Sequence, residues 1–318
     1  MAAPTNTVTT LNSFGNREDV EDVINRVAPE ETPFISNIGT SKATGIFHEW
    51  QTETLRAPSA SSSIALEGND ATLSAGNATS RVGNYCQLNQ DSRGVSGTQE
   101  AVDKAGRKSE MNRQKVLLGL ELKRDLEMRL IGNFASVAES GATTRKSAGL
   151  LAWLVSNDNR GASGADGGFS AGIVSAATNG TQRTFTEALV RTVLSSCFTN
   201  GGRPNQAYMG PAHKQQFSQF TGIANIRKEV TGAKMATIVG AADVYVSDFG
   251  NLTLIPHPYG LTRDCALIDP DMVAVGTLRG WTTEPLAKTG DSEKFQITAE
   301  KTLVMRNEKA HGVVADLT

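Results

Sequence analysis

The sequence predicts an α+β protein built from extended pieces rather than around one dense core. Three observations support this fold class. Residues 45–97 have the pattern of two strands joined by a long polar span, residues 108–139 that of one very long helix, and residues from 251 onward that of β-strands. Aromatic residues make up only 6% of the chain and glycine occurs 31 times, which favours a loop-rich protein.

Composition excludes several broad classes of function. The chain has 318 residues, is 39% hydrophobic and carries a formal net charge of −2. It has enough apolar material for two modest cores, but no strongly basic field of the kind that general nucleic-acid binding needs. No apolar run approaches the roughly 20 residues that span a bilayer, and residues 1–13 do not look like a signal peptide. Cys86, Cys197 and Cys265 are odd in number and widely spaced, which indicates reduced thiols in a cytoplasm.

The N-terminal region predicts a loose tail followed by a short helix. Residues 1–15 are rich in threonine and asparagine, and Asn16 can cap a helix. One apolar stripe follows at helical spacing, made of Val20, Val23, Ile24 and Val27. Pro29 ends this helix because the residue before a proline is pushed out of the α region. Residues 30–35 are expected to form an extended connector.

Residues 45–97 predict an arm that cannot stand alone. Strands are expected at 46–55 and 81–95, where Trp50 and Tyr85 lie among alternating polar residues. In the polar span 56–80, the only large apolar residues are Ile64, Leu66 and Leu73. So little apolar area does not offset the entropy of ordering the segment, and an isolated two-stranded ribbon is marginal in water. The arm is therefore either disordered or ordered by a partner.

Residues 108–139 predict a helix that acts as a beam. At 1.5 Å per residue it would be about 48 Å long, whereas an average helix has about 11–12 residues. One i, i+4 row of apolar residues runs along it: Leu118, Leu122, Leu126, Leu130 and Phe134.

The rest of the chain predicts a surface loop, an α/β unit and a β return. The loop is expected at 157–180, where Gly, Ser, Ala and Asn dominate. Helices are expected at 186–199 and 211–220, and strands at 207–209, 244–247, 252–255, 266–268, 272–275, 294–306 and 313–317.

No constellation of residues predicts catalysis, a cofactor or a metal. The chain has no Gly-x-Ser-x-Gly elbow and no P-loop. Its four histidines, His48, His213, His257 and His311, are isolated in sequence, and such residues are usually exposed or structural. The carboxylates near Pro270 could suggest an oxygen-ligand metal site, but a β-turn explains them better. We therefore predict no catalytic, cofactor-binding or metal-binding residue.

Several short motifs, in order, resemble one protein family. They are Asn16-Arg17-Glu18-Asp19, Pro29-Glu30-Glu31-Thr32-Pro33-Phe34, Glu49-Trp50-Gln51-Thr52, Val95-Ser96-Gly97-Thr98, Glu121-Leu122-Lys123-Arg124-Asp125-Leu126-Glu127, Leu286-Ala287-Lys288-Thr289-Gly290-Asp291 and Glu300-Lys301-Thr302-Leu303. With the arm and the beam helix, they resemble the major capsid proteins of tailed bacteriophages, in a podovirus-like subgroup with the Hong Kong ninety-seven capsid fold. The likeness runs from about residue 13 to residue 317.

The resemblance implies a domain plan and an assembly. The implied parts are an N-terminal arm at 1–44, an extended β-hairpin loop at 45–97, a peripheral domain at 98–183 with its spine helix at about 108–139, an axial domain at 184–250, and peripheral β-strands at 251–318. Subunits of this family form hexamers and pentamers that close into an icosahedral shell around double-stranded DNA. The implied setting is the virion capsid, assembled in the cytoplasm of a bacterial host, with no membrane partner.

Two features depart from the family pattern. The namesake phage cross-links its shell through a lysine on the extended loop, whereas this chain has no lysine between Lys42 and Lys104. Some relatives also begin with a scaffolding segment of about a hundred residues. Because only about fifteen residues precede the first motif here, scaffolding is expected as a separate protein. The resemblance further implies a portal, decoration proteins and packaged DNA, contacted non-specifically, as partners.

The sequence therefore predicts a structural shell subunit with no enzymatic activity. The residues expected at contacts between subunits are Phe34, Trp50, Ile64, Leu66, Leu73 and Tyr85. One alternative is the shell protein of a cellular nanocompartment with the same fold, which would enclose a cargo enzyme. A second alternative is a cytoplasmic enzyme in which residues 157–180 form a lid over an active site.

Overall fold

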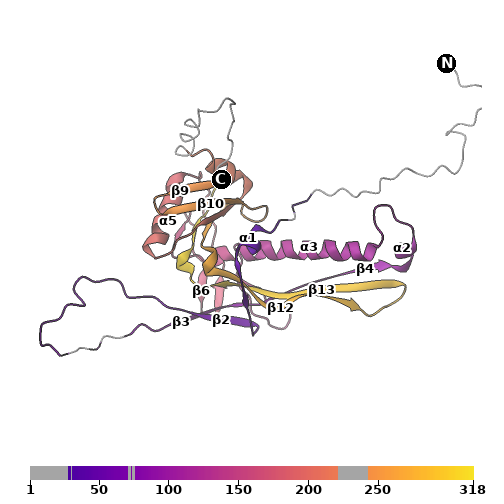
Figure 1. The fold of residues 1–318 in the computed structure, drawn as a ribbon, viewed down its shortest axis with the longest axis horizontal. Helices are drawn as coiled ribbons and strands as arrows, with labels where there is room; N and C mark the ends of the chain where they lie inside the picture. Colours follow the sequence, from indigo (N-terminus) through magenta and orange to yellow (C-terminus); the bar gives the residue numbers. More distant parts are fainter. Residues whose placement is uncertain (1–27, 30, 71–72, 74–75, 221–242) are drawn as a thin grey trace, which may run out of the picture.

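A computed structural model describes residues 28–29, 31–70, 73, 76–220 and 243–318. The tail expected at 1–15 and the helix expected before Pro29 lie outside these residues. Figure 1 shows the long helix α3 (Glu110–Ile131) running along a pair of long strands, a second sheet at one end of it, and an arm that points away from the body. The predicted α+β class is confirmed.

A four-stranded sheet lies against α3. Its strand order is β1 (Gly39–Lys42), β12 (Val273–Leu286), β13 (Ser292–Met305) and β4 (Gln87–Ser96). Strands β12 and β13 form one long hairpin, which is buried at the Val273–Met305 end and exposed towards its tip. The sequence predicted nearly all of β13 but only the first residues of β12, because the outer half of β12 carries no run of buried apolar residues.

Helix α3 begins as its sequence dictates. Ser109 is the N-cap, and its hydroxyl accepts a hydrogen bond from the backbone N–H of Asn112 at 3.2 Å. The predicted apolar row is buried at Leu118, Leu122, Leu126 and Leu130. Leu118 and Leu122 pack against Phe295 and Ile297 of β13. One apolar stripe of the helix therefore holds it against the sheet.

The helix ends earlier than predicted, at Ile131 rather than near residue 139. Gly132 has extended backbone angles, and Arg129 donates to the carbonyl groups of Ala135 and Ser147 just beyond the helix end. Gly149 packs so closely there that a Cβ on it would lie 2.1 Å from the Gly132 carbonyl oxygen. Tertiary packing therefore stops the helix, and Phe134 is not part of its apolar row.

A six-stranded sheet closes one end of the molecule. Its order is β5 (Asp158–Asn159), β14 (Gly312–Val314), β11 (Cys265–Ile268), β8 (Gln206–Met209), β10 (Gly250–Pro256) and β9 (Val244–Ser247). Ala207 and Met209 face the core formed with α5 (Glu187–Thr199) and α6 (Pro211–Phe217), whereas Tyr208 faces the core that contains the end of α3.

This sheet combines strands from both sides of residue 250, where the resemblance implies a boundary. The boundary expected at residue 250 falls inside the β9–β10 hairpin, where Ser247 pairs with Gly250. Strands β11 and β14, expected among the peripheral strands, pair within the same sheet as β8. The six-stranded sheet is therefore built from strands that lie in several separate parts of the sequence.

Short elements complete the chain. They are α1 (Pro33–Asn37), α2 (Gly97–Ala101), α4 (Leu150–Trp153), β2 (Phe47–Thr52), β3 (Ser80–Tyr85), β6 (Gly168–Ser170), β7 (Ile173–Ser175) and the 3-10 turns η1 (Pro270–Met272) and η2 (Glu308–Ala310). Two of them correct the sequence-based expectations. Helix α1 occupies part of the expected extended connector, and residues 157–180 contain β5 and the β6–β7 hairpin rather than a plain loop.

A buried carboxylate on α3 joins the separate parts of the fold. Glu127 has 0% exposure. Its side chain accepts hydrogen bonds from the backbone N–H groups of Phe34 and Ile35, at 2.6 and 2.9 Å. These N–H groups lie in the first turn of α1, where no carbonyl of the helix can accept from them. Its Oε1 atom also lies 2.9 Å from Nε2 of His257, which follows β10. One side chain therefore ties the N-terminal segment and the end of β10 to the beam.

Replacing Glu127 should strongly destabilise the subunit. In Glu127→Ala, two backbone N–H groups and the His257 ring lose a buried partner, and we expect a loss of about 3–5 kcal/mol in the free energy of unfolding. Glu127→Gln should lose less because the amide oxygen still accepts. Urea denaturation of the unassembled subunit measures both. The control Lys123→Ala, exposed on the same helix, should stay within about 0.5 kcal/mol of wild type; equal values for Glu127→Ala and this control would contradict the assignment.

Candidate assembly surfaces

The arm is a short two-stranded ladder with a long connection. Strands β2 and β3 pair from Phe47 with Tyr85 to Thr52 with Ser80. The second expected strand, 81–95, is broken at Cys86, after which β4 pairs with β13 instead. The Cys86 carbonyl accepts a hydrogen bond from Arg145 Nε at 2.8 Å, and its side chain is buried. The β2–β3 ladder and its connection therefore span residues 47–85, and β4 belongs to the four-stranded sheet.

The root of the arm is fixed to the body of its own subunit. The ring of Trp50 packs against Trp153 at 5.5 Å between centroids, and Trp153 stacks on Phe169 at 5.8 Å with an interplanar angle of 2°. The fully buried Asn84 accepts a hydrogen bond from the backbone N–H of Ala148 at 2.9 Å. These contacts set the direction in which the arm leaves the molecule.

Beyond the root, the described part of the chain does not support the arm. We call residues 53–79 the arm loop, and every described residue in it is exposed. Its large aliphatic side chains are exposed by 92% at Leu55, 76% at Ile64, 84% at Leu66 and 101% at Leu73. In its described residues, the hydrogen bonds of the loop join loop residues to one another, such as the one from Asn77 Nδ2 to the Thr54 carbonyl at 2.7 Å. The arm loop thus presents apolar side chains that no described part of this subunit covers.

The structure divides the six predicted contact residues into three groups. Ile64, Leu66 and Leu73 lie on the arm loop. Trp50 and Tyr85 are partly buried at the arm root, where Tyr85 packs against Phe47. Phe34 is a correction: it has 0% exposure and packs edge-on against Tyr208, so it belongs to the core of its own subunit.

Sequence reasoning missed one candidate on the arm loop. Leu55 was placed at the end of the first expected strand, but β2 ends at Thr52 and leaves Leu55 exposed. The signal that could have found it is its position directly before Arg56, at the start of the polar span.

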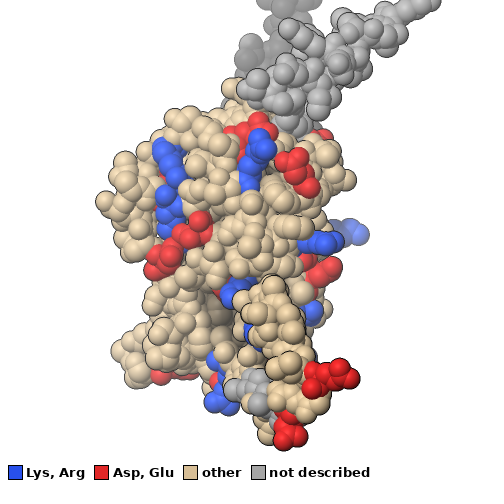
Figure 2. All heavy atoms as spheres, turned by 90° about the vertical axis from the view of Figure 1, so that its left-hand side faces the viewer, with Lys and Arg blue, Asp and Glu red and all other residues tan. Residues whose placement is uncertain are grey.

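The face of the molecule from which the arm projects carries no field of one sign. Figure 2 views this face and shows lysine, arginine, aspartate and glutamate side chains interspersed over it, with large uncharged areas between them. This distribution agrees with the formal net charge of −2. Apolar contact and strand pairing, rather than charge steering, are the interactions this face offers.

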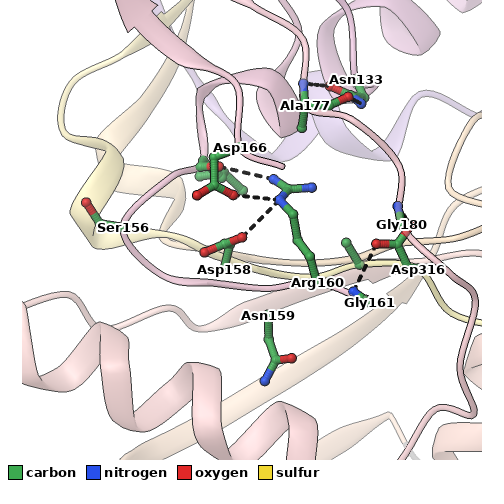
Figure 3. Close-up of polar contacts among 12 residues, drawn as sticks. Asn133, Ser156, Asp158, Asn159, Arg160, Gly161, Asp166, Ala177, Gly180 and Asp316 are labelled. Atoms are coloured by element: carbon green, nitrogen blue, oxygen red, sulfur yellow. Dashed lines mark hydrogen bonds and ion pairs between the residues drawn. The ribbon is translucent and has the colours of Figure 1, made fainter. Parts of the chain in front are cut away.

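Residues 157–180, considered above as a possible lid, are fastened down by a polar cluster (Figure 3). Nε of Arg160 lies 2.9 Å from an Asp158 oxygen and 2.8 Å from an Asp166 oxygen. The buried Asp316 accepts hydrogen bonds from the backbone N–H groups of Gly161 and Gly180, at 3.0 and 2.8 Å. Both ends of the segment are therefore pinned to the C-terminal residues, which does not suit a lid that opens and closes.

Burial shifts the titration of several groups in and near this cluster. Burial, reinforced by Asp166, raises the pKa of Asp158 to about 6, and burial also raises the pKa of Asp264 to about 6. For Asp166, burial alone would raise the pKa, but hydrogen bonds with Asp158 and Arg160 outweigh it and lower the pKa. These shifts reflect a packed polar cluster in which Asp158 holds a proton towards Asp166 at mildly acidic pH.

The buried histidine and cysteines have structural surroundings. Burial lowers the pKa of His311 to about 4 and raises the pKa of Cys86 to about 11 and of Cys197 to about 12, so these thiols are not activated. Within the described residues, no group of three or more His, Cys, Asp or Glu side chains is arranged to hold a metal ion. In the same part of the chain, no helix is both long enough and apolar enough to cross a bilayer.

Comparison with solved structures identifies the fold. The chain is similar to a capsid of the native GTA particle, with a TM-score of 0.61 at 11% identity over 97% of this chain and 98% of that one. A structure from Mycobacterium phage Bobi gives 0.61 at 12% identity over 95% of each chain. The structure of phage G gp27 major capsid proteins and gp26 decoration proteins gives a TM-score of 0.53 at 9% identity, over 98% of this chain and 100% of the other. The fold is that of phage capsid proteins, of the Hong Kong ninety-seven type.

The family follows from the sequence itself. The model of the SU10 major capsid protein family matches residues 3–318, and the chain belongs to that family. A search of curated protein sequences gave no match. The capsid-protein resemblance drawn from the short motifs is thus confirmed, and the protein is a major capsid protein of the tailed-phage type.

The raised pKa values predict how stability depends on pH. Because the folded-state pKa of Asp264 lies above its ordinary value, the folded state binds the proton more tightly, and this group's stabilising contribution is lost as the pH rises from about 4 to about 6. Asp264→Asn removes the charged form and should be more stable than wild type at pH 7, by about 1–2 kcal/mol after allowance for partial exposure, but not at pH 4.

Urea denaturation at pH 4 and pH 7 measures this difference. Asp70→Asn, an exposed substitution on the arm loop, serves as the control and should match wild type at both pH values. A difference between Asp264→Asn and wild type that is the same at both pH values would contradict the account.

Proposed function

We propose that this major capsid protein assembles as hexamers and pentamers into an icosahedral shell that encloses double-stranded DNA, and that each arm loop grips a neighbouring copy. The observation that carries the proposal is the arm loop, a segment with four exposed large aliphatic side chains on a fixed root. Fully burying one such side chain contributes about 1.5–3 kcal/mol. Burial against a neighbouring copy supplies the apolar contacts that the subunit itself does not provide.

The grip is non-covalent in this proposal. No lysine occurs between Lys42 and Lys104, so the lysine cross-link of the namesake phage has no counterpart on the arm. Strand pairing and apolar packing take its place. An interface of standard size, about 1,600 Å² in total, repeated around a ring and between rings, makes a stable shell through avidity.

The remaining partners follow from the capsid role. We propose a portal, a separate scaffolding protein and decoration proteins as partners, with the shell assembled in the cytoplasm of a bacterial host. The solved phage G capsid pairs a major capsid protein with decoration proteins, which supports the last of these. Packaged DNA would be contacted non-specifically. The protein's role is structural, without catalysis.

The two alternatives from the sequence find less support. A nanocompartment shell would share the fold, but the match over residues 3–318 is to a phage major capsid family. An enzyme with a lid at 157–180 would need that segment free to move, whereas Asp316 and Arg160 pin it.

Deleting residues 56–80 should abolish closed shells. We expect soluble subunits or capsomers, because the root contacts of Trp50 and Asn84 remain while three of the four exposed aliphatic side chains, Ile64, Leu66 and Leu73, are gone. Electron microscopy and analytical ultracentrifugation of the purified variant measure the outcome. Shells like those of wild type from the deletion variant would sink the proposal.

A finer variant tests the apolar grip alone. In Ile64→Ser/Leu66→Ser/Leu73→Ser, assembly should weaken by about 1.5–3 kcal/mol for each side chain that the shell buries. The thermal midpoint of the unassembled subunit should not change, because these side chains are exposed there. The matched control Ser61→Ala/Ser63→Ala, in the same loop, should assemble like wild type. Equal assembly of both variants would show that the apolar side chains are not the contact.

A further inference from the structure

A line of lysines follows one flank of the beam helix α3, where the helix lies beside the β12–β13 hairpin. Figure 1 shows this hairpin running along α3. The lysines come from β1, from α3 and from the hairpin, and none of them is buried. We call them the lysine stripe, which consists of Lys42, Lys115, Lys123, Lys288, Lys294 and Lys301.

Strand register brings two of these lysines together at one end of the stripe. Lys42 of β1 pairs with Thr277 of β12, and Thr277 pairs with Lys301 of β13. Directly paired residues point their side chains to the same face of a sheet. That face packs on α3, because Val275 and Leu303, which pair in the neighbouring row, are buried with the end of the helix. The Cα atoms of Lys42 and Lys301 are therefore two strand spacings apart, about 10 Å.

Aromatic rings hold two of the lysine side chains in place without neutralising them. Lys301 Nζ lies 5.6 Å from the centroid of the Trp281 ring, and Lys115 Nζ lies 5.7 Å from that of the Phe295 ring. A ring face attracts a cation but adds no negative charge. Burial, and after it repulsion from Lys123 of α3, lower the pKa of Lys301. Lys123 and Lys301 therefore lie close together as like charges.

The other end of the stripe is a groove of about 410 Å³ between the start of α3 and the tip of the hairpin. Lys115, Lys288 and Lys294 line it, and in the described part of the chain Glu293 is the one acid among its lining residues. Its lining is therefore positively charged. Lys301 lies six residues beyond Phe295 on β13, so the stripe follows the beam for about 20 Å.

The stripe lacks the carboxylate partners that nearby arginines have. Among the described residues, none of its six lysines forms an ion pair with a carboxylate, and the lysines that do are Lys104 and Lys214. In a chain with a formal net charge of −2, the stripe is thus a local excess of positive charge. The arginines of the same helix and sheet that do pair with a carboxylate include Arg93, Arg113 and Arg279.

Double-stranded DNA is an anion whose form matches such a line of charges. A duplex carries one negative charge per about 1.7 Å of its axis, so about 12 charges lie along 20 Å. Lysine ammonium groups bind phosphate as point charges, without the fixed geometry of the arginine fork. A carboxylate or a small anion would neutralise only part of the stripe. Basic side chains clustered along a helix are the electrostatic footprint of a protein that contacts the nucleic-acid backbone.

We propose that the lysine stripe binds the phosphate backbone of the double-stranded DNA that the shell encloses, whatever the base sequence. This inference rests on the proposed function, because the shell brings a duplex to every subunit. The stripe lies on the flank of the beam and the grip between subunits on the arm loop. DNA binding and shell closure therefore depend on different residues and can fail separately.

The salt dependence of DNA binding tests the proposal. The stripe variant is Lys42→Gln/Lys123→Gln/Lys288→Gln, which changes the three most exposed lysines of the stripe. The probe is a fluorescently labelled DNA duplex, and its anisotropy with the unassembled subunit gives the association constant between about 50 and 200 mM salt. The slope of log K against log salt should fall in magnitude by about 1 for each lysine that contacts phosphate, up to about 3. Two duplexes of different sequence should lose affinity equally, because phosphate contacts carry no sequence information.

The control Lys108→Gln/Lys146→Gln/Lys309→Gln makes the same change in charge outside the stripe and should keep the wild-type slope. Circular dichroism confirms that both variants are folded, and electron microscopy should show closed shells from both. An unchanged slope in the stripe variant, or no DNA binding by the wild-type subunit at about 50 mM salt, overturns the proposal while leaving the shell function intact. Loss of shells with an unchanged slope would mean that the stripe contacts protein, which also overturns it. Absence of shells from the wild-type protein would overturn the shell function and with it the role of the stripe.

Discussion

The buried carboxylate of Glu127 is the constraint on which the arrangement of this subunit depends. A charge at 0% exposure must be matched by donors, and here the donors come from elements far apart in the sequence: the start of α1, and His257 after β10. Satisfying it forces the N-terminal segment across the beam helix. That crossing places β1 beside β12, where Gly39 pairs with Ala274, and it fixes where the chain preceding α1 leaves the body.

A second consequence is a division of the subunit into parts that are complete and parts that are not. The beam, its sheet and the six-stranded sheet each bury an apolar cluster within one chain. The arm has a root held by Trp50 and Asn84 and a loop in which every described residue is exposed. A rigid root with an uncovered end is a suitable design for a protein that must present the same contact in the same direction in every copy of a shell.

Local patterns in the sequence predicted the helices and strands that bury one face and expose the other. The leucine row of α3, the alternation in β13 and the apolar stripe of α5 were all recognisable, because each reflects a repeat of the element itself. The two-stranded arm with its three exposed aliphatic residues was predicted for the same reason, since an absence of apolar partners is visible in sequence.

What the sequence could not predict depends on contacts between distant residues. The end of α3 is set by Gly149 and Arg129, and the switch of strand partner at Cys86 by Arg145. Phe34 was taken for a surface contact because its burial arises from Tyr208, far along the chain. The ordering of 157–180 depends on Asp316, near the C-terminus, which polar composition alone does not reveal.

Hydrogen exchange of the backbone amides tests the central claim most directly, namely that the arm loop is completed by a neighbouring copy. The exchange of residues 53–79 would be compared between the unassembled subunit and the closed shell, with the interior of α3 as an internal reference that is protected in both. We expect fast exchange of the arm loop in the subunit and strong protection in the shell. Equal exchange of the arm loop in the two states would contradict it.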